Sequence, residues 1–331
     1  MKNKILDILT QTGEYVSGEK LSQLCGVSRT AVWKQVNKLK EEGYQIESQS
    51  RIGYRLVYRP DKLIKTELLE GLQTLNWGKH SLYTFDNVDS TNNIAKDYGA
   101  QGKPEGTVIV AESQSRGKGR LGRLWASPAG QGIWASIILR PSILPTLAPQ
   151  ITLVMAVGMA KALNKIEGIE AKIKWPNDIL VNNRKVAGIL TELSAEIERI
   201  NYIVIGIGVN VNQDINDFPE EFRENAISLK EAVGMRLSRV KILQWMLEEI
   251  EKTYHYYLAE GLKPILAEWR NYSLTIGREV EVIMGNERIK GSAVDVGDDG
   301  SLIVKDENNI MHKIIAGDVS LRGKWGSYAG D

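Results

Sequence analysis

A glycine-rich basic loop is the part of the sequence whose residue types point most directly to chemistry. Four cations and three glycines lie within residues 116–123. Glycines let backbone N–H groups approach an anion closely, and arginine offers planar, multidentate contacts to phosphate. The segment therefore predicts a loop that closes over a phosphate or an acyl phosphate. An exposed basic loop that contacts nucleic acid is the alternative.

Two familiar phosphate-binding motifs do not account for this loop. Its glycines match G-x-G-x-x-G at Gly117, Gly119 and Gly122, but a dinucleotide fold needs a following helix and an acidic residue about 20 residues on. Residues 126–130 do not read as a helix start, and the chain has no Asp or Glu between Glu112 and Glu167. A Walker loop would need Lys where Arg123 stands.

Further segments explain the loop by a resemblance. They are Ser90-Thr91-Asn92, Lys174-Trp175-Pro176-Asn177-Asp178, Lys185-Val186-Ala187-Gly188-Ile189-Leu190, Gly206-Ile207-Gly208-Val209-Asn210 and a closing strand at residues 317–322. Together with the basic loop and in this order, they resemble the family of bifunctional biotin–protein ligases and biotin-operon repressors. Each segment alone is unspecific, but their order covers essentially the whole chain.

The resemblance implies a two-step reaction. Family members use ATP and Mg²⁺ to convert biotin into biotinyl-5′-adenylate, and then pass biotin to a lysine of a biotin carboxyl carrier protein. A carboxylate and a phosphate must meet in line, so cations are needed against their repulsion. The implied catalytic residues are Lys185, Arg120 and Asp178. Lys185 would contact both anions, and Asp178 would orient or deprotonate the acceptor lysine, unless it is only a turn residue.

The resemblance also implies a biotin pocket and a nucleotide site. Hydroxyl and amide side chains supply the donors and acceptors that a ureido ring needs. The implied biotin-binding residues are Ser90, Thr91, Asn92, Gln114, Gly117, Lys118, Gly119, Arg120, Trp125, Lys185, Gly188 and Gly206. The implied nucleotide contacts are Arg123, Asn177, Asn210 and Arg322. Ser90 and Thr91 also read as a helix cap, and Trp125 as a core residue. Lys118 replaces the common arginine, which keeps the charge but loses bidentate geometry.

The first 60 residues read as a winged helix. They carry ten Lys+Arg and six Asp+Glu. Helical spacing of apolar residues near the start is followed by a helix at residues 18–25 and a Gly-Val turn. A second helix follows, with Ser28 as its N-cap and Gly43 as its C-cap, and then a hairpin over residues 45–57. The predicted DNA-binding residues are Ser28, Arg29, Thr30, Trp33, Lys34 and, at the hairpin tip, Arg51. A winged helix used for protein contacts is the alternative.

The elements that must position the ligase motifs mix strands and helices. We expect strands over residues 107–112, 133–139, 171–175, 179–181, 185–193 and 202–212, with a hairpin turn at 182–184, and long helices over 147–166 and 238–258. Short strands follow over 279–284, 288–296, 302–305 and 311–315. The sequence thus predicts an α+β multidomain chain: winged helix-turn-helix (1–60), mixed or antiparallel α+β ligase domain (61–275) and SH3-like β-barrel (276–331).

Composition narrows the class of protein. Hydrophobic residues make up 43% and charged residues 25%, as in ordinary globular proteins. One cysteine excludes a Cys-based metal cluster, and three histidines far apart in the sequence argue against a His-rich metal site. No apolar run reaches about 18 residues and no signal core is visible, so a cytoplasmic protein without a membrane partner is expected. The resemblance further implies operator DNA as a partner and a homodimer when the adenylate is bound. A biotin sensor without catalysis and a lipoate–protein ligase are the alternative functions.

Overall fold

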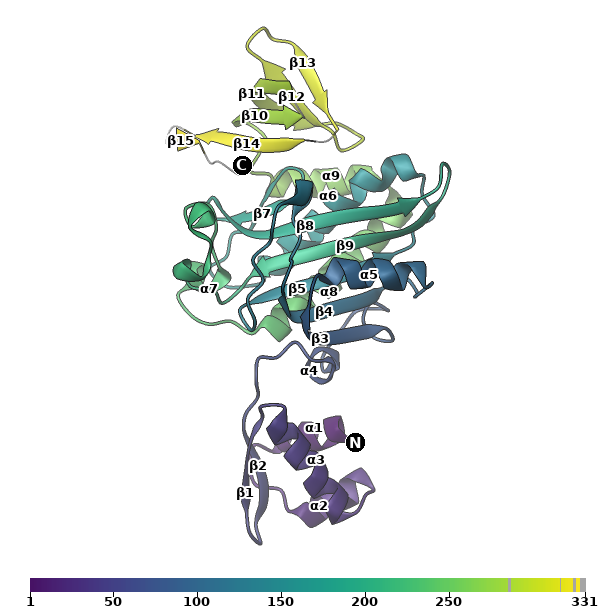
Figure 1. Cartoon of the computed structure of the whole chain (residues 1–331), viewed down its shortest axis with the longest axis vertical. Helices are drawn as coiled ribbons and strands as arrows, with labels where there is room; N and C mark the ends of the chain where they lie inside the picture. Colours follow the sequence, from purple (N-terminus) through teal and green to yellow (C-terminus); the bar gives the residue numbers. More distant parts are fainter. Residues whose placement is uncertain (285–286, 316, 324–325, 328–331) are drawn as a thin grey trace. The chain divides into compact units, whose positions relative to one another are not determined.

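The computed structural model describes residues 1–284, 287–315, 317–323 and 326–327, without the side chains of Asn3 and residues 322–327. The chain divides into two compact units, Met1–Lys62 and Leu63–Asp331. Figure 1 shows the order of the elements along the chain.

The first unit has the predicted winged-helix order. Its elements are α1 (Lys2–Thr12), α2 (Gly18–Cys25), α3 (Arg29–Glu41), β1 (Gln45–Gln49) and β2 (Gly53–Tyr58). The Ser28 hydroxyl accepts the Ala31 N–H at 3.2 Å, which confirms the predicted cap. Val32, Val36 and Leu39 are buried along one face of α3. α3 ends before Glu42, so the left-handed Gly43 follows the C-cap instead of forming it.

A seven-stranded sheet is the frame of the second unit. Its order is β3-β4-β5-β9-β8-β7-β6, and only the β3–β4 pair is parallel. The strands are β3 (Leu82–Val88), β4 (Thr107–Gln114), β5 (Gly132–Leu139), β6 (Lys172–Lys174), β7 (Asp178–Val181), β8 (Arg184–Ala195) and β9 (Ile200–Asn210). Asn182 and Asn183 both have positive φ in the β7–β8 turn, as a tight hairpin requires. The mixed, mostly antiparallel sheet confirms the predicted class.

Helices cover both faces of this sheet (Figure 1). α5 (Thr91–Ala100) lies on one face, and α6 (Ala148–Leu163), α8 (Arg239–Glu260) and α9 (Leu262–Tyr272) lie on the other. Successive residues of β4 alternate between the two cores: Ile109 packs on the α5 side, whereas Val108 and Val110 join the larger core. The short helix α4 (Lys65–Leu69) contacts α8 and the edge strand β3, and α7 (Leu229–Val233) is tied to the end of β9 by the Lys230 N–H, which donates to the Val211 carbonyl at 2.7 Å.

α6 is apolar because it is a core helix. Residues 145–163 have a mean hydropathy of 1.4, enough by length and composition to cross a membrane, but 67% of that window is buried inside the protein. α6 packs closely on α8, since a Cβ at Gly158 would lie 2.7 Å from the Ile250 Cα. Its composition is therefore explained by the packing of the helices behind the sheet.

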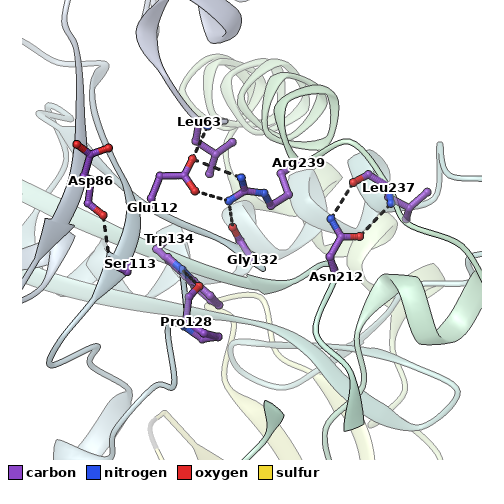
Figure 2. A network of polar contacts seen from close by, with 10 residues as sticks. All are labelled: Leu63, Asp86, Glu112, Ser113, Pro128, Gly132, Trp134, Asn212, Leu237 and Arg239. Carbon is purple, nitrogen blue, oxygen red and sulfur yellow. Dashed lines mark hydrogen bonds and ion pairs between the residues drawn. The ribbon is translucent and has the colours of Figure 1, made fainter. Parts of the chain in front are cut away.

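A buried ion pair joins the start of α8 to the sheet (Figure 2). Arg239 Nη1 lies 2.9 Å from Glu112 Oε2 and donates to the Gly132 carbonyl at 3.3 Å. Glu112 also accepts the Leu63 N–H at 2.6 Å. Arg239 and Glu112 are 2% and 8% exposed. Four segments of the unit therefore meet at this carboxylate and guanidinium.

The C-terminal segment forms a small antiparallel sheet of order β13-β12-β11-β10-β14-β15. The strands are β10 (Glu279–Met284), β11 (Glu287–Val296), β12 (Leu302–Asp306), β13 (Met311–Ile314), β14 (Asp318–Gly323) and β15 (Gly326–Ser327). Four strands in sequence order, with β14 returning beside β10, give the small β domain predicted from the short strands. The Trp175 indole N–H donates to the Gly300 carbonyl at 3.1 Å and ties this domain to the larger sheet.

Candidate active site

A pocket opens where the basic loop, one end of the large sheet and β14 meet. Most of the predicted ligase residues line it: Ser90, Thr91, Asn92, Gln114, Lys118, Gly119, Arg120, Arg123, Trp125, Asn177, Asp178, Lys185, Gly188, Gly206 and Asn210. Segments far apart in the sequence are therefore brought together as expected. Gly117 does not line the pocket. The side chain of Arg322 lies outside the described residues, but its backbone, in β14, pairs with Glu279 of β10.

A hydroxyl and amide network forms one end of the pocket. The Thr91 N–H and hydroxyl donate to Gln114 Oε1 at 2.8 and 3.1 Å. The buried Ser136 hydroxyl lies 2.8 Å from Thr91 Oγ1 and 2.6 Å from Asn92 Oδ1. Ser90 occupies the N-cap of α5 but makes no side-chain cap bond. The Ser90 hydroxyl is thus available to a polar ligand beside the network.

Ser136 was not found from the sequence. Its signal is a hydroxyl in the otherwise apolar strand β5, whose residues are all buried. Glu192 was missed as well: it accepts from Asn92 Nδ2 at 2.8 Å and from Lys96 Nζ at 2.7 Å. Burial alone would raise the pKa of Glu192, but these two donors lower it below its ordinary value. A charged Glu192 fixes the Asn92 carboxamide against the pocket.

Glycines on β8 and β9 form a flat floor under Trp125. Gly188 and Gly208 are cross-strand neighbours. A Cβ at Gly208 would lie 2.6 Å from Trp125 Nε1, and one at Gly206 would lie 2.3 Å from Asn92 Oδ1. Trp125 Nε1 is buried and has no hydrogen-bond partner within the described part of the chain. The absence of side chains on these glycines therefore lets the Trp125 ring lie flat on the floor, with an indole N–H that donates to no described residue.

Cations from the loop and from β8 lie at the other end of the pocket. Lys185 Nζ is 2.7 Å from Asp178 Oδ1 and 5.1 Å from the centre of the Trp125 ring. Arg120 donates to Asn177 Oδ1 at 3.0 Å, and Arg123 Nη2 is 2.8 Å from Asp318 Oδ2.

The loop itself is held by its glycines and by β14. Arg120 donates to the Gly317 carbonyl at 3.2 Å and lies 3.4 Å from Asp318. The Gly117 carbonyl accepts the Trp125 N–H at 2.9 Å, and a Cβ on Gly117 would lie 2.3 Å from the Trp125 carbonyl. Gly117 thus shapes the loop from outside the pocket. Lys118 Nζ lies 2.5 Å from Asn93 Oδ1, at the start of α5.

Sequence reasoning missed several residues of the pocket wall. Asp318 pairs with Arg120 and Arg123 of the loop, although it is almost 200 residues away in the sequence. Phe218 and Phe222 line the pocket from the segment after β9. That segment contains two short 3₁₀ turns, and the Lys185 N–H donates to the Asn225 carbonyl at 2.7 Å. No local pattern in the sequence marks these contacts, because each depends on how distant segments pack.

The predicted DNA-binding residues lie together on the first unit. Ser28, Arg29, Thr30, Trp33 and Lys34 are all exposed on the N-terminal half of α3, and Arg51 is exposed at the hairpin tip with φ 66°. Trp33 is 53% exposed, which is unusual for so large an apolar side chain. Cationic and aromatic groups thus project from the helix that a winged helix inserts into DNA.

Comparisons with known proteins agree with this fold and pocket. Residues 84–210 match the Biotin/lipoate A/B protein ligase family, residues 2–55 an HTH domain and residues 275–322 the Biotin protein ligase C terminal domain. The Bifunctional ligase/repressor BirA of Bacillus subtilis is 41% identical over 97% of this chain and 98% of that protein. The corresponding Escherichia coli protein is 32% identical over 95% of each chain. A solved biotin protein ligase from Aquifex aeolicus, in complex with biotin and ATP, aligns with a TM-score of 0.64 and 32% identity over 73% of this chain and 98% of that one.

The fold and site define an adenylate-forming ligase fused to a winged helix. The chain belongs to the family of bifunctional biotin–protein ligases and biotin-operon repressors. The resemblance drawn from the sequence motifs is confirmed. The chain is a ligase with an N-terminal helix-turn-helix domain.

Proposed function

We propose that this chain condenses biotin with ATP, in the presence of Mg²⁺, to biotinyl-5′-adenylate and pyrophosphate, and transfers biotin to a lysine of a biotin carboxyl carrier protein. The observation that carries the proposal is the polarity of one pocket. Its Thr91–Gln114–Ser136 network suits a ureido ring, and the cations Lys185, Arg120 and Arg123 suit a carboxylate and phosphates.

The proposed binding mode follows the pocket from end to end. Ser90, Thr91 and Gln114 would exchange hydrogen bonds with the ureido group. The tail of biotin would lie along Trp125, whose ring stacks directly on the glycine floor and lines the pocket. The carboxylate would then reach Lys185. The loop cations and Asn210 would take the nucleotide, together with Arg322.

In the first half-reaction, a biotin carboxylate oxygen attacks the α-phosphorus of ATP, and the bond to the leaving pyrophosphate breaks. Lys185 would bridge the carboxylate and the α-phosphate, and Arg120 would offset the charge that builds up. In the second half-reaction, the acceptor lysine attacks the acyl carbon and AMP leaves. Asp178, once its contact with Lys185 loosens, would hold the ammonium of that lysine and take up its proton.

Mg²⁺ would be held chiefly by the phosphates of ATP. Within the described residues no group of three or more His, Cys, Asp or Glu side chains is placed to hold a metal ion. The carboxylates lining the described pocket wall are Asp178 and Asp318, each beside a cation. This donor set fits an ion that arrives with ATP and keeps most of its water, as Mg²⁺ does in many nucleotide sites. The ion would neutralise phosphate charge.

The direct test is incorporation of labelled biotin into an apo carrier domain. We expect biotin incorporation to require both ATP and Mg²⁺. A ten-fold excess of lipoate should lower it by less than 2-fold, because the ureido-binding network discriminates a polar ring from a disulfide ring. Mass spectrometry of the carrier provides the readout. Absence of incorporation by folded, biotin-binding protein would reject the ligase mechanism in favour of a sensor, and equal incorporation of lipoate would reject biotin specificity.

We propose that α3 of the winged helix reads the major groove of operator DNA. The test uses a DNA duplex that the wild-type protein has selected from random sequences. Replacing Arg29 with Ala should lower the affinity for this duplex by about 10- to 100-fold, the effect of losing an arginine that contacts a base. Lys4→Ala, which removes an exposed cation of α1, is the matched control and should change affinity less than 3-fold. Fluorescence anisotropy at fixed salt measures both. Equal losses in the two variants would indicate general charge attraction instead of readout.

The regulatory part of the proposal is a homodimer that forms when the adenylate is bound. Two copies would present two winged helices to two half-sites, and unmodified carrier protein would compete by drawing off the adenylate. Such coupling requires that the adenylate bind the dimer more tightly than the monomer. Sedimentation velocity with and without biotin plus ATP tests this: an unchanged monomer would contradict it.

We place the biotin ligase activity in the cytoplasm. We divide the chain into three domains, at residues 1–60, 61–275 and 276–331.

A further inference from the structure

Lys174 stands out among the cations that line the pocket. Six cationic side chains line the described wall, against two carboxylates: Lys118, Arg120, Arg123, Lys174, Lys185 and Arg278 against Asp178 and Asp318. Five of the six make a hydrogen bond or an ion pair there. Lys174 makes neither with any residue that the structure describes. The excess of positive charge indicates a site for a polyanion, and Lys174 is its uncommitted member.

The position of Lys174 is fixed by the sheet. It is the last residue of β6 and faces Asp178 in the register of the β6–β7 pair. The charged groups that act on its ammonium are Asp178 and Lys185, which pair with each other, and Asp318 and Arg123, which also pair with each other. Lys174 therefore lies within electrostatic reach of both the Lys185–Asp178 pair and the Arg123–Asp318 pair at the cationic end of the pocket.

The surroundings of Lys174 disfavour its charged form while the pocket holds no anion. Burial is the largest cause that lowers the pKa of the Lys174 ammonium, and Lys185 lowers it further, whereas Asp178 and Asp318 oppose the shift. A structural lysine in such a place would be expected to pair with a protein carboxylate. A lysine ammonium that has no carboxylate of the protein as its partner is stabilised most by an incoming anion.

We propose that Lys174 is a further catalytic residue of the adenylation step, whose ammonium contacts the phosphate chain of ATP and pairs with the departing pyrophosphate. The inference rests on the proposed ligase mechanism. As the carboxylate oxygen bonds to the α-phosphorus, the bond from that phosphorus to the bridging oxygen breaks. Pyrophosphate leaves with the electron pair and gains negative charge, which Lys174 offsets. The transfer step releases AMP and no pyrophosphate, so Lys174 contributes little there.

The test separates the two half-reactions. Lys174→Met removes the charge and keeps most of the volume. We expect kcat/KM for ATP in biotin-dependent ATP–pyrophosphate exchange to fall by about 100-fold, and transfer from preformed biotinyl adenylate to an apo carrier domain to change by less than about 3-fold. Lys172→Met is the matched control: it lies on the same strand outside the pocket, 2.9 Å from Glu170. It should leave both rates unchanged.

Two outcomes would overturn the inference: exchange within about 2-fold of wild type, or equal losses in both half-reactions, which would indicate only a structural role. If Lys174→Met does not fold, Lys174→Arg decides. Arginine stays charged at all working pH values, so it should restore exchange and move its alkaline limit upward, because wild-type Lys174 loses its proton at a lower pH than an ordinary lysine. An unchanged alkaline limit would contradict the proposal. A wild-type protein that makes no biotinyl adenylate would instead refute the proposed function itself.

Discussion

Lys185→Met should lower the rate of biotinyl adenylate formation by about 1,000-fold, equivalent to roughly 4 kcal/mol of transition-state stabilisation. Lys185 comes from the first residues of β8, and its Nζ lies 2.7 Å from Asp178 at the junction of the biotin and phosphate ends of the pocket. A single ammonium there can touch both the carboxylate and the α-phosphate while they are forced together. The Lys185 ammonium also lies 5.1 Å from the centre of the Trp125 ring.

The measurement for Lys185 is single-turnover formation of labelled biotinyl adenylate. Arg184→Met is the matched control, because Arg184 is the neighbouring cation of the same hairpin, pairs with Glu231 at 2.8 Å and does not line the pocket. It should stay within about 2-fold of wild type. Lys185 is about one-third exposed but Asp178 only 17%, so the variant leaves a largely buried carboxylate without this partner, and its folding is checked by circular dichroism. Adenylate formation at the wild-type rate in Lys185→Met would remove Lys185 from the mechanism.

The parts of the site that lie on contiguous motifs could be predicted from the sequence. Each of the basic loop, the segment 174–178 and the strand ending at Asn210 carries its functional groups within a few residues, so short patterns reveal them. Asp318 could not be found in this way, because it reaches Arg123 only after β14 pairs with β10. Lys174 was visible in its motif, but its significance depends on which neighbours are paired, and only coordinates give that.

The fold was predictable where hydrophobic patterns are strong. The buried runs of β5 and β9 and the apolar helix α6 were expected within a few residues of their observed ends. β3 was missed because Leu82–Val88 includes Asp86 and Asn87, which are uncommon in strands. α9 was missed because it follows Gly261 directly and has Pro264 in its first turn. In both elements tertiary packing outweighs local preference.

Arg239→Met should destabilise the second unit by about 3–5 kcal/mol, the usual cost of removing one partner of a buried ion pair. The guanidinium is 2% exposed and holds both Glu112 and the Gly132 carbonyl (Figure 2). Without it, a carboxylate that is 8% exposed keeps only the Leu63 N–H as a donor in this network. The melting temperature, followed by near-UV circular dichroism, should fall by about 10 °C for a body of this size.

The control for Arg239 is Arg236→Met, an exposed cation three residues earlier, which should shift the melting temperature by less than about 1 °C. Adding Glu112→Gln to Arg239→Met removes the stranded charge, so the double variant should be more stable than the sum of the two single losses predicts. Additive losses would mean that the two side chains act independently, contrary to the geometry. Because Glu112 lies on β4, two residues before Gln114, a weakened pair should also raise the KM for biotin, whereas a purely global loss of stability would leave the KM of the folded fraction unchanged.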